Sequence, residues 1–235
     1  MIDTVLLDGD DTLWHNEPLF AEMTTRFLAL LASYHSSEWI QERLYETEIR
    51  NLRYYGYGIK SFVLSMIETA TELTEGRISG SEIDVLLQFG KEMFEAPVNL
   101  LEHAEEAVAR LAERYRLILV TKGDLFDQES KLARSGLAEF FDVVEIVAEK
   151  SVSTYKALAT RNDVNFTSAV MVGDSLKSDV MPVAEMGGNA IHIPYGTTWQ
   201  HETVSEDALR AYDYRTAASI GEVPGIVETL NGLLI

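Results

Sequence analysis

Hydrophobic positions follow two different rhythms along the chain. Residues 4–7 form a short apolar run that stops at the polar turn beginning with Asp8, as expected of a buried β-strand that ends in a loop. From residue 17 to residue 94, apolar residues recur at the three- and four-residue spacing of amphipathic helices. This stretch therefore predicts consecutive helices and no strand.

Beyond residue 96 the pattern alternates between helix and strand. Apolar runs predict buried strands at 117–120, 143–147, 169–172 and 190–193, with helical patterns between them at about 101–114, 126–135 and 152–161. The end of the chain predicts a strand near 212–215 and a helix near 223–233. Continuous apolar strands separated by helices are typical of a parallel sheet that is covered on both faces.

The predicted fold class is therefore α/β. We expect a Rossmann-like core, which is a doubly wound parallel sheet, with an inserted all-helical cap domain. The core is discontinuous in this interpretation and comprises residues 1–14 and 96–235, while the helical cap occupies residues 15–95. Boundaries predicted in this way hold to within about 2–4 residues.

Composition narrows the functional classes. The 235 residues include 19 basic and 38 acidic side chains, a formal charge of −19, so the basic footprint of a nucleic-acid-binding protein is missing. The chain has no cysteine, which excludes thiolate chemistry. No apolar run approaches the roughly 20 residues of a membrane span, and the N-terminus lacks a signal-peptide pattern. We expect a cytoplasmic protein, either monomer or homodimer, that binds neither nucleic acid nor membranes.

Polar residues follow four of the predicted strands. The carboxyl ends of parallel strands meet at one edge of a sheet, and ligands bind outside that edge. We therefore expect acids, a hydroxyl group and lysines to converge there: Asp8, Asp10, Thr121, Lys122, Lys150, Asp174 and Asp179.

Crowded carboxylates repel one another unless a positive group lies between them. Mg²⁺ meets this need, because it binds a few carboxylates and keeps water and phosphate oxygens as its other ligands. Zinc is the weaker candidate, since neither cysteine nor histidine occurs in these segments. An aspartate can also attack phosphorus to form an aspartyl-phosphate. The convergent residues therefore predict Mg²⁺-dependent phosphoryl transfer.

These segments resemble the motifs of the haloacid dehalogenase-like (HAD) hydrolase superfamily, in its phosphatase branch with a helical (C1-type) cap. Asp8-Gly9-Asp10-Asp11-Thr12 is similar to the first motif, Asp-x-Asp-x-Thr. Thr121 resembles the second motif, Lys150 the third, and the run from Gly173 to Asp179 the fourth. The spacing to Tyr155 favours Lys150 over Lys156 for the third motif.

The resemblance implies a role for each acid. Asp8 is the expected nucleophile and a metal ligand. Asp10 is expected to protonate the leaving alkoxide, to deprotonate the attacking water and to offer its backbone carbonyl to the metal. Asp174 is expected to bind Mg²⁺, and Asp179 to support the metal's waters or Lys150.

The remaining motif residues are expected to bind the phosphate. The resemblance implies that Thr121 and the backbone near Gly9 and Lys122 hold phosphoryl oxygens, and that Lys150 neutralises nucleophile and phosphate. Lys122 replaces a frequent asparagine and is a further candidate for substrate contact.

Asp10 selects the reaction within this resemblance. A halide leaves without a proton, whereas an alkoxide needs one, so an acid at this position favours phosphate esters. The predicted function is hydrolysis of a small phosphate monoester, such as a nucleotide or a sugar phosphate. A phosphomutase is an alternative. A receiver-like signalling domain is another, although the first-strand position of Asp8 and the helical insertion speak against it.

Two further features have both structural and functional interpretations. For Asp11 and Ser175 we favour the structural one, a turn or helix cap. The segment from Arg50 to Lys60 is rich in aromatic and basic residues and contains two glycines. It is typical of a helix end followed by a loop. It is also the best candidate for a substrate-facing surface, through Arg53, Tyr54 and Tyr57.

Overall fold

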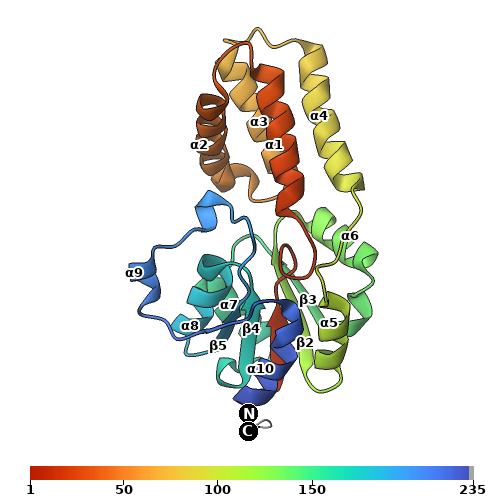
Figure 1. Ribbon diagram of the computed structural model, residues 1–235, viewed down its shortest axis with the longest axis vertical. Helices are drawn as coiled ribbons and strands as arrows, with labels where there is room; N and C mark the ends of the chain where they lie inside the picture. Colours follow the sequence, from red (N-terminus) through yellow and green to blue (C-terminus); the bar gives the residue numbers. More distant parts are fainter. Residues whose placement is uncertain (233–235) are drawn as a thin grey trace. The chain divides into compact units, whose positions relative to one another are not determined.

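The computed structural model describes residues 1–232, and the chain divides into two compact units (Figure 1). The first unit contains Met1–Glu17, Val98–Lys122 and the chain from Gln128 onward. The second unit contains Pro18–Pro97 together with Gly123–Asp127. A membrane-crossing helix, which needs both length and an apolar sequence, is not found among the described residues.

The first unit is built on a parallel sheet, in which the described strands have the order β3-β2-β1-β4-β5-β6. The strands are β1 (Thr4–Leu7), β2 (Arg116–Lys122), β3 (Val143–Val147), β4 (Ala169–Gly173), β5 (Asn189–His192) and β6 (Arg215–Thr216). Leu7 of β1 lies opposite Leu119 of β2 and Val172 of β4. The three central strands therefore deliver the residues that follow them to one edge, which confirms the predicted Rossmann-like core.

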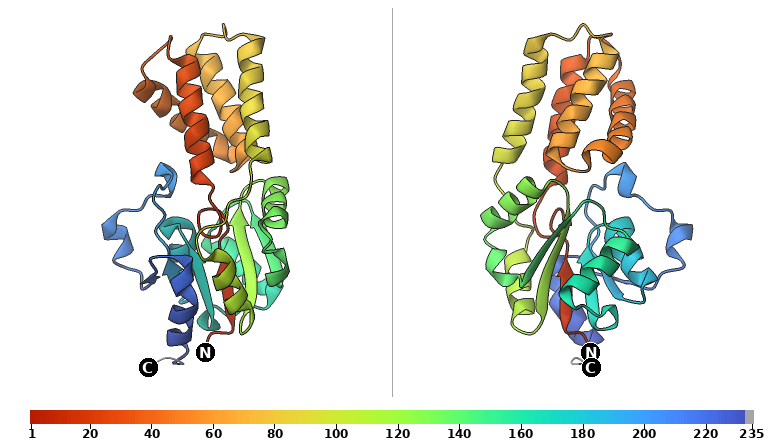
Figure 2. Two further views of the ribbon diagram at one scale, coloured as in Figure 1. Left: turned by 45° about the vertical axis from the view of Figure 1, so that its right-hand side comes forward. Right: turned by 180° about the vertical axis from the view of Figure 1, so that it is seen from behind.

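Helices cover both faces of this sheet (Figure 2). They include α5 (Ala104–Ala112), α6 (Leu125–Ser135), α7 (Val152–Asn162), α8 (Met181–Glu185) and α10 (Val223–Leu230), while the short helix α9 (Glu206–Leu209) lies between β5 and β6 in the chain. Val5 and Leu7 pack in the same cluster as residues of α5 and α10. Leu6 points to the opposite face and packs with residues of α7 and α8. Burial on both faces explains why β1 is a continuous apolar run rather than an alternating one.

The second unit consists mainly of four helices in the described chain, as the periodicity predicts. They are α1 (Glu17–Leu31), α2 (Ser37–Tyr55), α3 (Ile59–Leu73) and α4 (Gly80–Glu95). Ser36 caps α2, and Ser79 forms a capping box with Glu82 at the start of α4. The apolar faces of the helices meet in one cluster, in which Phe27 is fully buried.

The loop Gly123–Asp127 groups with these helices, although it follows β2 directly. Lys60 Nζ binds both carboxylate oxygens of Asp124, at 3.0 and 2.9 Å. Gly58 has φ +107°, and a Cβ atom there would lie 3.1 Å from the Asp124 backbone nitrogen. The hydrophobic pattern of the sequence assigns this loop to the core domain. It cannot show the Lys60–Asp124 ion pair, because that pair joins positions far apart in the chain.

Two predicted boundaries near the end of the chain need correction. The strand predicted at 212–215 is observed only at Arg215–Thr216, where the backbone pairs with β5. A strand this short has too few residues to show a pattern, so only its pairing defines it. The helix predicted to residue 233 is observed as Val223–Leu230, and residue 233 lies outside the described residues.

The buried core of the helical unit generates a stability prediction. Phe27→Ala is expected to reduce the free energy of unfolding by about 3–5 kcal/mol, because it leaves a cavity in a closed cluster. Leu87→Ala on α4 is the control, since Leu87 is 44% exposed and should change stability by less than about 0.5 kcal/mol. Urea unfolding followed by circular dichroism measures both; equal effects would contradict the proposed core.

Candidate active site

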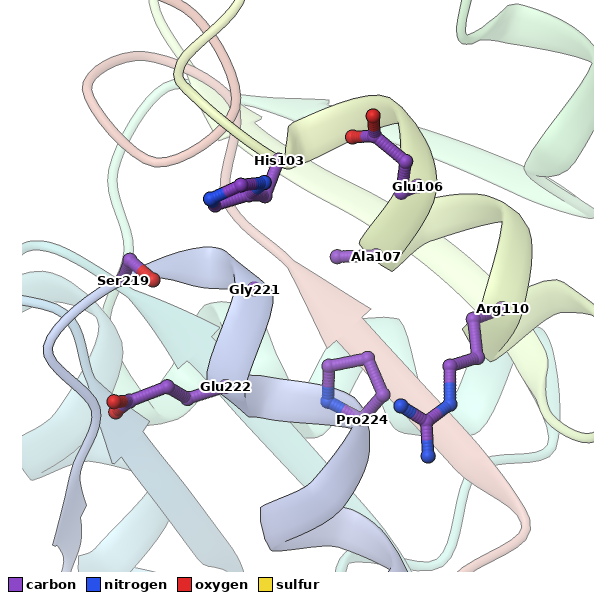
Figure 3. A pocket seen from close by; sticks show the side chains of 8 residues that line it. All are labelled: His103, Glu106, Ala107, Arg110, Ser219, Gly221, Glu222 and Pro224. Atoms are coloured by element: carbon purple, nitrogen blue, oxygen red, sulfur yellow. The ribbon is translucent and has the colours of Figure 1, made fainter.

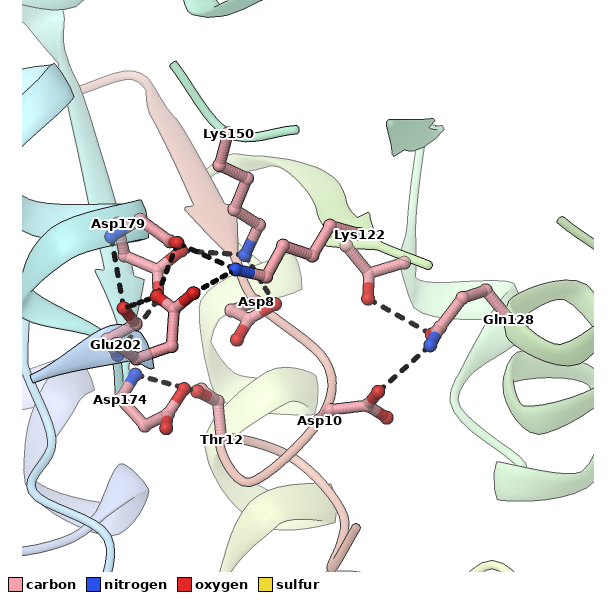
Figure 4. A network of polar contacts seen from close by, with 12 residues as sticks. Asp8, Asp10, Thr12, Lys122, Gln128, Lys150, Asp174, Asp179 and Glu202 are labelled. Carbon is pink, nitrogen blue, oxygen red and sulfur yellow. Dashed lines mark hydrogen bonds and ion pairs between the residues drawn. The ribbon is translucent and has the colours of Figure 1, made fainter. Parts of the chain in front are cut away.

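Lys150 lies between two carboxylates at the carboxyl edge of the sheet (Figure 4). Its Nζ is 2.5 Å from Asp8 Oδ1 and 2.6 Å from Asp179 Oδ1. Burial alone would disfavour the charged amine, but the carboxylates of Asp179 and Asp8 outweigh it and raise the pKa of Lys150 well above its usual value. Lys150 is therefore a buried positive charge next to Asp8 and Asp179, while Lys156 is exposed.

Asp8, Asp174 and Asp179 form a group that could hold a cation. Oxygen atoms of the three side chains lie within 4.8 Å of one another. Burial and the Asp8 carboxylate raise the pKa of Asp174 well above its usual value, and the pKa of Asp179 rises to about 7 for the same reasons, although Lys150 opposes this shift. These shifts indicate that Lys150 leaves the negative charge only partly compensated. A hard divalent cation such as Mg²⁺ fits this donor set.

Gly173, the last residue of β4, allows Asp179 to approach the strand. A Cβ atom at Gly173 would lie 2.2 Å from Asp179 Oδ2, closer than any real contact. Asp179 belongs to the π-helical turn Leu176–Val180, and its Oδ2 also accepts a hydrogen bond from the Ser175 backbone. π-Helical turns are often found at functional sites. The missing side chain at Gly173 is thus what lets Asp179 reach Lys150.

Asp10 points to a different set of partners. Trp14 Nε1 donates to its Oδ1 at 2.6 Å, and Gln128 Nε2 donates to its Oδ2 at 2.9 Å. Lys131 Nζ lies 3.1 and 3.2 Å from the two oxygens. The Asp10 carboxylate therefore has its own donors and does not belong to the group formed by Asp8, Asp174 and Asp179. Binding of a metal by the Asp10 backbone carbonyl stays a prediction.

Thr121 and Asp10 are linked through Gln128. The Thr121 hydroxyl donates to Gln128 Oε1 at 3.0 Å, and the amide of the same side chain reaches Asp10. Gln128 is 2% exposed. A helix glutamine has no distinctive sequence pattern, so only the fold reveals it. Gly9, next to Asp10 in the chain, packs against the Trp14 ring, and a Cβ atom at Gly9 would lie only 2.7 Å from that ring. Phosphoryl binding by Thr121 and Gly9 stays a prediction.

Lys122 already has two polar partners. Its Nζ lies 2.5 Å from Glu202 Oε1 and 2.9 Å from Ser178 Oγ. Glu202 Oε2 accepts hydrogen bonds from Ser175 and Ser178 at 2.5 and 2.6 Å. Burial opposes the charge on Glu202, yet Lys122 and the two hydroxyl groups lower its pKa to about 2. Substrate contact by Lys122 stays a prediction, and Glu202, which follows no motif, is a site residue that the sequence does not reveal.

Asp11 and Ser175 cap helices, as predicted. Asp11 accepts hydrogen bonds from the backbone of Asn16 and Glu17, at the start of α1. Ser175 accepts from the Ser178 backbone. Burial raises the pKa values of Asp11 and Glu17 to about 7 each. The Asp11 carboxylate adds to the shift of Glu17, and Asp10 and Asp8 add to the shift of Asp11, which the backbone N–H groups of Asn16 and Glu17 oppose.

The candidate substrate residues of the second unit lie at the end of α2 and in the loop after it. The Arg53 guanidinium lies 4.6 Å from the centre of the Tyr54 ring, and Tyr54 is 65% exposed. Tyr57 is half-buried. The first part of this segment is a helix end with Gly56 as the C-cap, as the structural interpretation expects. A role in substrate binding stays a prediction for Arg53, Tyr54 and Tyr57.

A pocket of the first unit, separate from the sheet edge, lies between α5 and the start of α10 (Figure 3). Its lining includes His103, Glu106, Arg110 and Glu222. The Arg110 guanidinium is held by Glu228, with both oxygens at 2.9 Å. None of the lining residues belongs to the acidic group at the sheet edge, and the mixed charges do not indicate a ligand class.

Comparisons with known proteins identify the family of this chain. The family model of haloacid dehalogenase-like hydrolases matches residues 2–187. A haloacid dehalogenase-like family hydrolase from Xanthomonas campestris is 38% identical, with 98% of this chain and 92% of that chain covered and a TM-score of 0.87. The chain therefore belongs to the haloacid dehalogenase-like hydrolases. A comparison with curated protein sequences finds no match.

More distant structures share the fold. A candidate HAD hydrolase from Bacillus subtilis bound to magnesium is 16% identical, with 96% of this chain and 98% of that chain covered and a TM-score of 0.65. A candidate β-phosphoglucomutase from Thermotoga maritima is 18% identical, with 97% of this chain and 100% of that chain covered and a TM-score of 0.68. Others are described as a 2-haloacid dehalogenase and a predicted phosphoglycolate phosphatase. Likeness of fold thus does not select the reaction.

The raised pKa values of Glu17 and Asp11 predict how stability changes with pH. Between their ordinary values of 4.5 and 3.8 and the folded values of about 7, the folded protein binds protons that the unfolded chain has released. Their contribution to stability is therefore lost as the pH rises toward and through 7. Glu17→Gln should flatten the fall in melting temperature between about pH 5 and 7.5, while Glu22→Gln on the exposed side of α1 should not. Parallel curves for both variants would contradict this assignment.

Crowding among Asp8, Asp174 and Asp179 predicts binding of a divalent cation. Mg²⁺ should raise the melting temperature of the wild type, because it binds the folded state alone. Asp174→Asn should remove most of that increase, whereas Asp163→Asn, at an exposed position, should retain it. Calorimetric scans in EDTA and in millimolar MgCl₂ provide the measurement, and an unchanged increase in Asp174→Asn would exclude this cation site.

Proposed function

We propose that this protein is a Mg²⁺-dependent phosphatase that hydrolyses a small phosphorylated metabolite through an aspartyl-phosphate on Asp8. Family membership establishes a hydrolase, and the choice of a phosphate ester rests on Asp10. This acid follows the proposed nucleophile by two residues and approaches Thr121 through Gln128. A halide would leave without help, whereas an alkoxide requires a proton in the transition state.

In the first step, an oxygen of Asp8 attacks the phosphorus atom. The bond from phosphorus to the ester oxygen breaks, and Asp10 transfers its proton to that oxygen, so the alcohol leaves neutral. Lys150, at 2.5 Å from Asp8, holds the nucleophile in place and offsets the negative charge that gathers around it. Most of the rate enhancement then comes from alignment and charge neutralisation.

In the second step, water replaces Asp8 on phosphorus. Asp10, now a carboxylate, takes a proton from the water as its oxygen bonds to phosphorus. The bond between phosphorus and Asp8 breaks, which releases inorganic phosphate and restores both acids. Thr121 is suited to hold a phosphoryl oxygen in both steps, because its hydroxyl is buried at the end of β2.

The cation would be held by Asp8 and Asp174, with Asp179 binding it or orienting its waters. Bound there, Mg²⁺ would neutralise phosphoryl oxygens next to the attacking carboxylate. The chemistry of the donor set supports this assignment, because three carboxylates and a single lysine amine meet in one buried group. The magnesium-bound relative from Bacillus subtilis supports it as well.

A screen of phosphorylated metabolites tests the proposed function. The wild type with Mg²⁺ should release inorganic phosphate from at least one small monoester, and Asp8→Asn should reduce kcat by on the order of 10³-fold or more, because it removes the nucleophile. Acid-quenched samples of the wild type should contain phosphorylated Asp8, as detected by peptide mass spectrometry.

Asp3→Asn is the matched control for this screen. Asp3 is an exposed acid just before β1, and its replacement should leave kcat within about twofold of the wild type. The proposed function would be wrong if the wild type hydrolysed no phosphate ester, or if Asp8→Asn retained full activity. Transfer of the phosphoryl group to a second sugar phosphate, instead of to water, would indicate a mutase.

A further inference from the structure

Helix α6 contributes two side chains to the environment of Asp10, although neither belongs to a motif. Gln128 and Lys131 are three residues apart and therefore lie on the same face of the helix. Gln128 Nε2 donates to Asp10 Oδ2 at 2.9 Å, and Figure 4 shows this contact. Lys131 Nζ bridges the carboxylate, at 3.1 Å from Oδ1 and 3.2 Å from Oδ2.

The position of the Lys131 amine is closely determined. Lys131 is 6% exposed, and a buried ammonium group is strongly unfavourable unless acceptors surround it. Besides Asp10, it donates to Asn16 Oδ1 at 2.7 Å. Lys131 therefore ties α6 to two points of the loop that follows β1. Because it contacts both Asp10 oxygens, it also restricts rotation of that carboxyl group.

We propose that Lys131 is a positioning residue for the acid–base group of the reaction: it holds the Asp10 carboxyl group in the orientation from which Asp10 exchanges a proton with the leaving oxygen. This inference rests on the proposed phosphatase function. As the ester bond breaks, Asp10 gives up its proton and becomes negatively charged. The Lys131 ammonium group and the N–H groups of Gln128 and Trp14 already face the oxygens on which that charge develops, and such preorganised donors stabilise a transition state.

The role predicts a dependence on the leaving group. p-Nitrophenolate is stable as an anion and needs little protonation, whereas p-methylphenolate is a stronger base and needs a proton from Asp10. The ratio kcat/KM covers the steps up to departure of the alcohol and is insensitive to the later hydrolysis of the phosphoaspartate. A loss of proton donation therefore appears in kcat/KM as a stronger dependence on the leaving group.

Lys131→Met tests this dependence with Mg²⁺ present. Its kcat/KM should fall about tenfold more for p-methylphenyl phosphate than for p-nitrophenyl phosphate, because loss of positioning removes only part of the roughly 10²–10⁴-fold contribution of general acid catalysis. Lys131→Arg, which keeps a charged donor, should recover most of the difference. Lys91→Met, an identical change at an exposed position of α4, should leave both values unaltered. Retained activity on the nitrophenyl ester also reports that the variant is folded.

A double-mutant cycle with Asp10→Asn separates positioning from general destabilisation. If Lys131 acts through Asp10, Lys131→Met should add less than about twofold to the loss already caused by Asp10→Asn on p-methylphenyl phosphate. Equal losses on the two esters, or independent losses that multiply in the double variant, would overturn the role of Lys131 and leave the proposed function intact. A wild type that releases phosphate from no ester would instead overturn the proposed function, and this role with it.

Discussion

The contact of Lys150 with Asp8 and Asp179 is the interaction on which the site depends. The neighbouring parallel strands β1 and β4 end at the same level and bring the acids that follow them into one buried group. Buried carboxylates are tolerated only when positive groups or donors compensate them. Lys150 supplies one charge for two of these acids, and burial together with the charge of Asp8 and Asp179 raises the pKa of Asp174. The same imbalance makes the group suitable for a divalent cation.

Three lysines distribute the remaining positive charge among separate partners. Lys150 faces Asp8 and Asp179, Lys122 faces Glu202, and Lys131 faces Asp10. Lys122 belongs to β2, Lys131 to α6 and Lys150 to the loop before α7, so Asp10 has a different electrostatic environment from Asp8. This separation suits the proposed reaction, in which one carboxylate attacks phosphorus while another exchanges a proton, because the two tasks require different protonation states.

The same fold occurs in proteins described as dehalogenases, a phosphatase and a mutase. Function in such a family depends on individual side chains more than on the sheet that carries them. In this chain, the proposed choice of a phosphate ester rests on Asp10, which is held by Trp14, Gln128 and Lys131. The Asp8–Lys150 pair, by contrast, would suit attack on either class of substrate.

The sequence by itself determined the parallel sheet, the helical insertion and the strand-end acids. Apolar runs and helical spacing are local properties, and the carboxyl ends of parallel strands must meet, so Asp8, Asp174 and Lys150 could be grouped without coordinates. Tertiary structure alone decided the partners of these residues. Gln128, Lys131 and Glu202 look like ordinary polar residues in the sequence, and the Lys60–Asp124 pair joins positions 64 residues apart. Such contacts depend on how the elements pack, and residue spacing carries no information about that.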